Sequence, residues 1–270
     1  MYPIDEKTLS FTTTAMPRPE LIETTYSSFS RNLQGIDFKK VTLYLNVDSF
    51  PDKNEDHKRQ EVVDIARKYF GNVIVNLPDS PNFAMAVKWC FSKIETFYNF
   101  HLEDDWQLIS PISISSFNQF FVPPHVQQVG LRAWKFVRSD FWLSPSIIRG
   151  TFCREMSEKM NVTDNPEVQL RILKSIYRNE SFLYFPFDPK AVILKDLGRN
   201  WMKSKNYNRG NKDFVQWEIR ENGKGIQRLV DQNGQISQSF LLAEQNNKNM
   251  SKSRWARQKA IKLSRRGKII

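Results

Sequence analysis

The chain has 270 residues, of which 40% are apolar and 13% aromatic, so it should fold around a full hydrophobic core instead of remaining disordered. Nine of its 40 basic residues and no acid lie between Lys248 and the C-terminus, which leaves 31 basic against 29 acidic residues elsewhere. No apolar run is long enough for a transmembrane helix, and the start, MYPIDEKTLS, lacks a signal-peptide pattern, so we expect a cytoplasmic protein.

Strand and helix patterns alternate through the first hundred residues. Short apolar runs predict strands at Leu9–Thr13, Val41–Val47, Asn72–Leu77 and, fourth, at Phe97–Leu102. Helical spacing between them predicts helices from Pro19 to about Leu33, from about Asp56 to Phe70, and from about Phe83 to Phe97. This alternation predicts parallel pairing with right-handed crossovers, which gives an α/β fold with a Rossmann-like, mostly parallel sheet flanked by helices.

The fourth strand runs into three consecutive carboxylates, Glu103, Asp104 and Asp105. Acids at the end of a buried strand repel one another and lose hydration, so the cluster is costly without a cation. A divalent metal that carries phosphates would make it favourable, and carboxylate oxygens suit Mg²⁺ or Mn²⁺. The alternative is that the three acids end the strand in a solvated turn, and the local pattern leaves both interpretations open.

Polar residues also follow the other predicted strands: Arg18 after the first, Asp48 after the second, and Asn82 after the third. In parallel α/β sheets, ligands bind at the carboxyl ends of the strands, where these residues should meet the acid cluster. The sequence has no Gly-x-Gly-x-x-Gly after the first strand and no Walker-type Gly-Lys-Ser/Thr. A metal-bound nucleotide diphosphate is therefore a better expectation than a dinucleotide or a P-loop site.

The order of these motifs resembles that of the GT-A glycosyltransferases, particularly the inverting family-2-like enzymes, over about residues 9–205. Residues 82–86 look like the family's Asn-x-Gly-x-x-x-Ala stretch, with Ala84 where glycine is common. Asp48 stands where the family recognises the base or ribose, and residues 195–201 look like its late Asp-x-Gly and basic loop. The donor-binding residues that the resemblance implies are Thr13, Arg18, Asp48, Asn82, Asp104, Arg149 and Arg199.

The resemblance also implies the metal and the general base. Glu103 and Asp105 hold the outer positions of a DXD-like motif, which implies Mn²⁺ or Mg²⁺ on Asp105 with help from Glu103, and a UDP-sugar as donor. The family places the acid that deprotonates the acceptor near residues 164–167, but Asn165-Pro166 replaces its usual Glu-Asp pair. The base is therefore open between Glu167, the first choice, and Asp164, and Glu167 would also suit an ordinary first-turn helix acid.

After Asp196 the chain is rich in basic and aromatic residues, as expected of an enzyme that holds DNA phosphates and a flipped base. In this it resembles bacteriophage-type enzymes that glycosylate hydroxymethylated pyrimidines in DNA, which would place it in the host cytoplasm. The residues expected to contact nucleic acid are Lys203, Lys205, Arg209, Arg254, Arg257, Lys262 and Arg265. The alternatives are a bacterial transferase acting on surface polysaccharide or glycolipid, and a non-catalytic nucleic-acid-binding protein.

Three segments follow from these patterns. Residues 1–205 should form the GT-A catalytic domain, 206–247 an acceptor-side extension, and 248–270 a basic helical tail. Asn222-Gly223 and Asn233-Gly234 are turn signals that predict a hairpin or loop at Gly223–Gly234 in the extension.

Overall fold

The computed structural model describes residues 2–49, 57–131, 143–167, 169, 182–186 and 191–204, and the backbone alone of Lys203, 207–209 and 217–219. All of these residues belong to one compact unit, Met1–Ile219, and the second unit is Arg220–Ile270. The hairpin expected at Gly223–Gly234 and the tail 248–270 lie outside the described residues, so the three-segment division stays a prediction.

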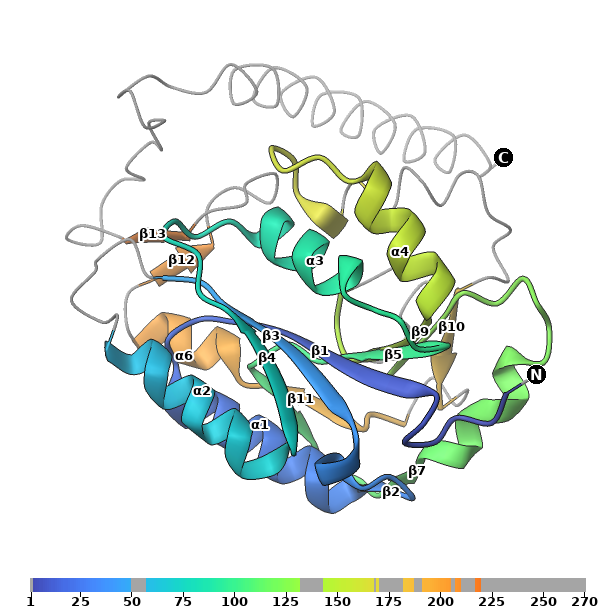
Figure 1. Cartoon of the computed structure of the whole chain (residues 1–270). Coiled ribbons are helices and arrows are strands. Elements are labelled where there is room, and N and C mark those ends of the chain that lie inside the picture. Colours follow the sequence, from blue (N-terminus) through green and yellow to red (C-terminus); the bar gives the residue numbers. More distant parts are fainter. Residues whose placement is uncertain are drawn as a thin grey trace, which may run out of the picture. The chain divides into compact units, whose positions relative to one another are not determined.

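A seven-stranded sheet forms the centre of the described unit, in the order β10-β8-β9-β5-β1-β3-β4 (Figure 1). Its strands are β1 Leu9–Ala15, β3 Thr42–Val47, β4 Asn72–Asn76, β5 Tyr98–His101, β8 Gln128–Leu131, β9 Ser146–Arg149 and β10 Phe182–Phe185. The β1–β3, β1–β5, β3–β4 and β8–β10 pairs are parallel, whereas β9 is antiparallel to both β5 and β8. The expected α/β class and mostly parallel sheet are confirmed.

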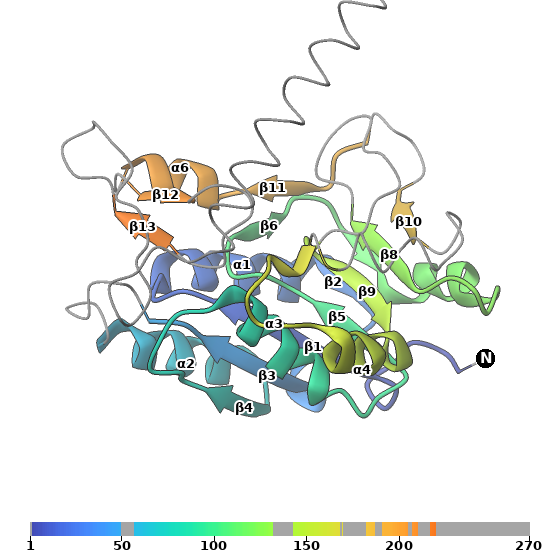
Figure 2. The ribbon, with the colours of Figure 1, turned by 90° about the horizontal axis from the view of Figure 1, so that it is seen from above.

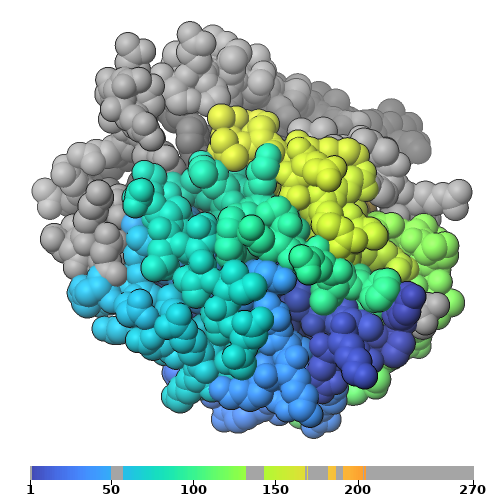
Figure 3. Space-filling view, viewed as in Figure 1, coloured from blue at the N-terminus to red at the C-terminus, as the bar shows by residue number. Residues whose placement is uncertain are grey.

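Helices cover both faces of the sheet (Figure 1). Helices α1 Pro19–Asn32 and α2 His57–Tyr69 pack together on one face, over a core that includes Phe11 and Phe100, whose stacked rings lie 5.0 Å apart. Helices α3 Phe83–Ser92 and α4 Gly150–Lys159 pack together on the other face and form much of the surface seen in Figure 3. The separate apolar core beneath α3 and α4 includes Phe91 and Phe152.

Helix α3 is shorter than its sequence pattern predicts. It begins at its N-cap, Asn82, and its last residue is Ser92, whereas the apolar spacing continues to Phe97. The chain turns after Ser92, because Tyr98 must donate its N–H to the carbonyl of Thr8 to start β5 beside β1. Tertiary strand pairing therefore ends the helix five residues early.

Short elements that the sequence patterns did not predict complete the unit. They are β2 Leu33–Gln34, η1 Phe38–Lys40, β6 Trp106–Leu108, β7 Ile112–Ser113, η3 Ile114–Phe121, β11 Leu194–Asp196, α6 Gly198–Ser204, β12 Tyr207–Arg209 and β13 Trp217–Ile219. Strand β11 pairs antiparallel with β6 and leads directly into α6 (Figure 2). The segment expected to be a loop, residues 195–201, is thus a strand followed by a helix, and it returns to the acidic end of β5. No helix in the described ranges is long and apolar enough to cross a bilayer.

Candidate functional site at the carboxyl ends of the parallel strands

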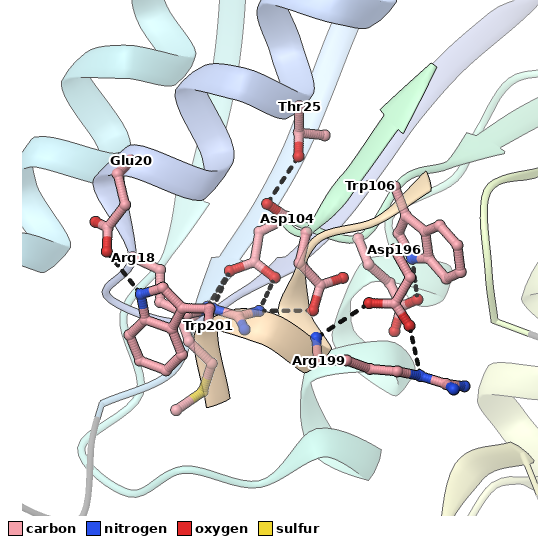
Figure 4. A network of polar contacts seen from close by, with 11 residues as sticks. Arg18, Glu20, Thr25, Asp104, Trp106, Asp196, Arg199 and Trp201 are labelled. Carbon is pink, nitrogen blue, oxygen red and sulfur yellow. Dashed lines mark hydrogen bonds and ion pairs between the residues drawn. The ribbon is translucent and has the colours of Figure 1, made fainter. Parts of the chain in front are cut away.

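A buried group of three charges, the charged cluster of Arg18, Asp104 and Asp105, lies where β1 and β5 end. Arg18 Nε donates to Asp104 Oδ2 at 3.0 Å, and Nη2 donates both to Asp104 Oδ1 and, at 3.2 Å, to Asp105 Oδ2 (Figure 4). The backbone N–H of Met16 donates to Asp104 Oδ2 at 3.0 Å, and Thr25 Oγ1 donates to the Asp104 carbonyl at 2.8 Å. The side chains of all three charged residues are at most 5% exposed.

In the charged cluster, burial and the charges of oppositely charged neighbouring residues shift each pKa in opposite directions. Burial disfavours the Arg18 cation, but the charges of Asp104 and Asp105 outweigh burial and raise the pKa of Arg18 above its usual range. Burial also raises the pKa of Asp104, and the charge of Arg18 opposes this rise. Each charge in such a group depends on its partners, because an unpaired ion in a protein interior costs several kcal/mol.

Helix α6 and the residue before it cover the charged cluster. Leu197 donates its N–H to the Asp105 carbonyl at 2.8 Å, and a Cβ placed on Gly198 would lie 2.0 Å from Asp105 Oδ2. Position 198 therefore requires glycine, which lets the backbone approach the carboxylate closely. The ring of Trp201 lies 5.2 Å from the Arg18 guanidinium carbon, and its Nε1 donates to Glu20 Oε1 at 2.6 Å (Figure 4).

The other acids near β6 and β11 are more accessible than the charged cluster. Glu103 Oε2 accepts a hydrogen bond from Trp106 Nε1 at 2.9 Å. Asp196 is the register partner of Trp106 and forms an ion pair with Arg199 at 2.9 Å, and the side chain of Arg199 is 65% exposed (Figure 4). A glutamate, an aspartate and an exposed arginine therefore lie around the buried Asp105.

These carboxylates can be tested against the metal that the sequence implies. The described ranges contain no group of three or more His, Cys, Asp or Glu side chains placed to hold a metal ion. Asp105 Oδ2 accepts a hydrogen bond from Arg18, and no described residue donates a hydrogen bond to Asp105 Oδ1. Mg²⁺ commonly binds through one or two carboxylates plus substrate phosphates. The donor set therefore fits a cation shared with a bound diphosphate, and it does not fit a cation held by the protein alone.

A second group, the amide cluster of Asn46, Asp48, Asn76 and Asn82, lies at the ends of β3 and β4. Asp48 accepts hydrogen bonds from Asn46 Nδ2 at 2.8 Å and from the backbone N–H of Asn82 at 3.1 Å, and Asn76 Nδ2 donates to Asn46 Oδ1 at 2.6 Å. Burial raises the pKa of Asp48 to about 6, and the hydrogen bonds from Asn46 and Asn82 only partly oppose this rise. The Asp48 N–H donates to the Ala15 carbonyl at 2.9 Å, so the amide cluster adjoins the end of β1.

The two candidate bases lie in the segment that follows α4. Asp164 accepts a hydrogen bond from Asn161 Nδ2 at 2.7 Å, and Glu167 Oε1 accepts a long one, 3.4 Å, from the N–H of Leu143. Asn82 Nδ2 donates to the Val162 carbonyl at 3.0 Å, which joins this segment to the amide cluster. The structure thus brings residues 161–167 to the same edge of the sheet as Asp48.

Two residues of the predicted donor site lie elsewhere. Thr13 is fully buried inside the sheet. Arg149 pairs with Tyr98 at the start of β5, the end opposite the acids, and its guanidinium donates to the carbonyls of Val126, Phe121 and Pro123. The reason is strand direction: β9 is antiparallel, so a residue at its carboxyl end lies at the amino end of β5.

The predicted nucleic-acid contacts fall mostly beyond what is described. Lys203 in α6 and Arg209 in β12 are described by their backbone alone. Lys205, Arg254, Arg257, Lys262 and Arg265 lie outside the described residues. Their role stays a prediction from the sequence.

Comparison with known proteins gives remote likenesses. No protein-family model and no curated protein matches the chain. Among solved structures it is similar to the mannosyltransferase PcManGT from Pyrobaculum calidifontis, in complex with GDP-Man and Mn²⁺, at 10% identity and a TM-score of 0.43, over 60% of this chain and 49% of that one. It is also similar to S. aureus TarS (12% identity, TM-score 0.46, 68% of this chain and 36% of that one).

A cytidylyltransferase from Leptospira borgpetersenii is another structural neighbour, at 11% identity and a TM-score of 0.42, over 74% of this chain and 85% of that one. The chain spans about half the length of PcManGT, 49%. With TM-scores below 0.5, none of these likenesses decides an activity for this chain.

Proposed function

We propose that the protein is a metal-dependent glycosyltransferase that moves a sugar from a nucleotide diphosphate, most simply a UDP-sugar, to a hydroxyl group. One observation carries the proposal: the charged cluster, the amide cluster and the segment with both candidate bases meet at the carboxyl ends of β1, β3 and β5. Ligands bind at this edge in parallel α/β sheets. The arrangement supplies acids for a metal, a buried acid for the nucleoside, and an acid for the acceptor.

On the donor side, Asp48 would accept hydrogen bonds from the base or ribose. A buried carboxylate that is held only by neutral donors is costly to the fold, and such groups are enriched at functional sites. Asp105, with Glu103, would hold Mn²⁺ or Mg²⁺ together with the diphosphate. When bound, the metal supplies positive charge for the leaving phosphates, and the exposed Arg199 would add to it. Arg18 and Asp104 would keep Asp105 in place.

On the acceptor side, the base would take the proton from the attacking hydroxyl. Glu167 is the first choice from the order of the motifs, and Asp164, which accepts a hydrogen bond from Asn161 at 2.7 Å, is the second. The proposed acceptor is a hydroxymethylated pyrimidine in phage DNA, supported by the concentration of basic residues after Asp196 in the sequence. A bacterial surface polysaccharide or glycolipid is the second candidate.

Calorimetric titration with UDP-glucose and GDP-mannose, with and without Mn²⁺, tests the donor site. We expect binding that requires Mn²⁺ and that weakens at least tenfold in Asp105→Asn, which keeps the shape of the side chain but removes its charge. Asp64→Asn on the exposed side of α2 is the matched control and should bind like the wild type. Absence of binding to either donor, or binding unaffected by Mn²⁺, would contradict the metal-dependent transferase.

A second experiment identifies the acceptor. Labelled donor is supplied at low salt with hydroxymethylated duplex DNA, with the same duplex unmodified, and with a bacterial lipid and polysaccharide extract. We expect label in the hydroxymethylated duplex alone. Label in the extract alone would favour the bacterial transferase, and metal-independent DNA binding without any transfer would favour a non-catalytic nucleic-acid-binding protein.

A further inference from the structure

We propose that Asn82 is a positioning residue that fixes the segment 160–167 against the end of β3, and that it does not itself bind the donor. The inference rests on the proposed function only for what the segment does, namely carry the general base. The anchoring itself is independent of any activity. Asn82 was expected at the donor, so this proposal gives it a different role.

Both polar atoms of the Asn82 side chain form a hydrogen bond within the chain. Its Oδ1 accepts a hydrogen bond from the N–H of Met85 at 3.0 Å and so caps α3, and its Nδ2 donates to the Val162 carbonyl at 3.0 Å. Its backbone N–H donates to Asp48 Oδ2 at 3.1 Å. One residue therefore joins three parts of the site: the acid after β3, the start of α3, and the segment after α4.

The segment that Asn82 holds is stiffened from within. Asn161 Oδ1 accepts hydrogen bonds from the N–H groups of Thr163 at 3.1 Å and Asp164 at 3.0 Å. Gln169 accepts from the Asn161 N–H at 2.8 Å and donates to the carbonyls of Asn161 at 3.1 Å and Asp164 at 2.7 Å. Because these bonds link Asn161, Thr163, Asp164 and Gln169 to one another, an anchor at Val162 also sets the position of Asp164, and Glu167 lies between Asp164 and Gln169 in the chain.

A second anchor acts on the same segment. Lys88, six residues after Asn82 and so about one and two-thirds turns along α3, donates its Nζ to the Met160 carbonyl at 2.8 Å. Both anchors therefore come from α3, whose start is fixed to Asp48 through Asn82. A general base works only within hydrogen-bond reach of its proton, and a displacement of about 1 Å costs up to about a hundredfold in rate. Helix α3 thus sets the distance between Asp48, the acid proposed to bind the nucleoside, and the general base.

Asn82→Ser isolates the anchor. Serine is as good an N-cap as asparagine and leaves the backbone N–H to Asp48 intact, but its hydroxyl is too short to reach Val162. Lys88→Met removes the second anchor. Asn72→Ser is the matched control, because Asn72 also donates its amide to one partner, Thr42 Oγ1 at 3.0 Å, at the far end of β4.

Two readouts are measured on the full chain. Amide hydrogen exchange of residues 160–167 should quicken about five- to tenfold in Asn82→Ser and Lys88→Met and stay unchanged in Asn72→Ser. With the donor that the wild type uses, kcat should fall about tenfold in Asn82→Ser, while the donor Kd stays within about twofold.

Unchanged exchange in Asn82→Ser would overturn the anchoring. A weaker donor Kd with normal kcat would overturn the positioning role and make Asn82 a donor-binding residue. If the wild type used no nucleotide sugar, the proposed function would fail while the exchange experiment still decided the anchoring.

Discussion

The charged cluster and the amide cluster both hold a buried carboxylate at the end of a parallel strand, but by different means. Asp104 is held by the guanidinium of Arg18 through two hydrogen bonds, with Asp105 sharing the same cation. Asp48 is held by neutral N–H groups of Asn46 and Asn82. The first carboxylate thus has a permanent counter-charge, and the second has none in direct contact.

This difference points to different roles for the two clusters, one in holding the site together and the other in binding a ligand. Asp104 accepts hydrogen bonds from Arg18 and from the Met16 N–H, and the Trp201 ring lies over Arg18, so Asp104 has little capacity left for a ligand. In the proposed function, Arg18 and Asp104 therefore place Asp105. A carboxylate held by neutral donors keeps an unfavourable charge that a ligand N–H or O–H can stabilise. The amide cluster therefore suits the nucleoside-binding role proposed for Asp48, and the charge of Asp48 depends on pH.

The largest effect is expected from Arg18→Met, which leaves two buried carboxylates without their cation. Removing one partner of a buried ion pair typically costs about 3 to 5 kcal/mol of folding free energy, to be measured by urea unfolding. Arg67→Met is the control, since Arg67 and Asp64 form an exposed pair at 3.7 Å that is worth at most about 1 kcal/mol. Equal losses in the two variants would contradict the role given to the charged cluster.

Asp48→Asn tests the amide cluster through pH. The folded pKa of Asp48 is about 6 against an ordinary 3.8, so between these values the folded protein holds a proton that the unfolded chain has lost. Asp48 therefore makes the wild type less stable as pH rises from about 4 to 6, by about 3 kcal/mol in all. Asparagine does not titrate, so the stability of Asp48→Asn relative to wild type should rise over this range, in urea unfolding at four pH values.

The affinity for the nucleotide-sugar donor should change in the opposite direction to the folding stability in Asp48→Asn. Asp48→Asn should gain stability at pH 7 and lose donor affinity, because the amide cannot offer a second acceptor oxygen to the base or ribose. Asp64→Asn, an exposed acid, should change neither quantity. If the unfolding free energy of Asp48→Asn had the same pH dependence as that of the wild type, Asp48 would not be the group that titrates.

The sequence patterns predicted the convergence of these clusters but not their internal bonds. Apolar runs and helical spacing predict parallel strands, and strand direction then brings Arg18, Asp48, Asn82 and the acids to one edge. The pairing of Arg18 with Asp104 joins residues 86 positions apart, and the further bond from Arg18 to Asp105 Oδ2 would compete with metal binding for that oxygen. Local sequence patterns do not show whether a carboxylate will bind an arginine or a metal.

Arg149 shows where the prediction from order alone fails. It is the last residue of a strand, β9, and it was expected at the same edge of the sheet as Asp48, which follows β3. Strand β9, however, runs antiparallel to β5, so its carboxyl end lies at the other edge. Periodicity and apolar content identify a strand but not its direction. Gly198, the glycine of the Asp-x-Gly stretch, is a sequence signal for an unusual or closely approached backbone position, but it does not identify the residue that the backbone approaches.

Gly198→Ala, at the start of α6, is expected to disturb the charged cluster through Asp105. The added Cβ would lie 2.0 Å from Asp105 Oδ2, so α6 or Asp105 must move. Overpacking of this kind costs about 1 to 3 kcal/mol, and the affinity for donor with Mn²⁺ should fall because Asp105 shifts. Gly71→Ala is unsuitable as a control, because its Cβ would meet the Lys39 carbonyl at 2.1 Å. Ser92→Ala, on exposed α3 surface, should leave both stability and affinity unchanged.

The smallest effect is expected from substitutions of Trp201, whose ring lies over Arg18. Trp201→Phe keeps an aromatic ring over Arg18 but removes the hydrogen bond of 2.6 Å to Glu20, which should cost about 0.5 to 1 kcal/mol. A double-mutant cycle with Glu20→Gln measures the coupling directly. Trp201→Leu also removes the ring and should lose about 0.5 to 1 kcal/mol more. If phenylalanine and leucine were equivalent, the ring would add nothing to the ion pairs that Arg18 forms with Asp104 and Asp105.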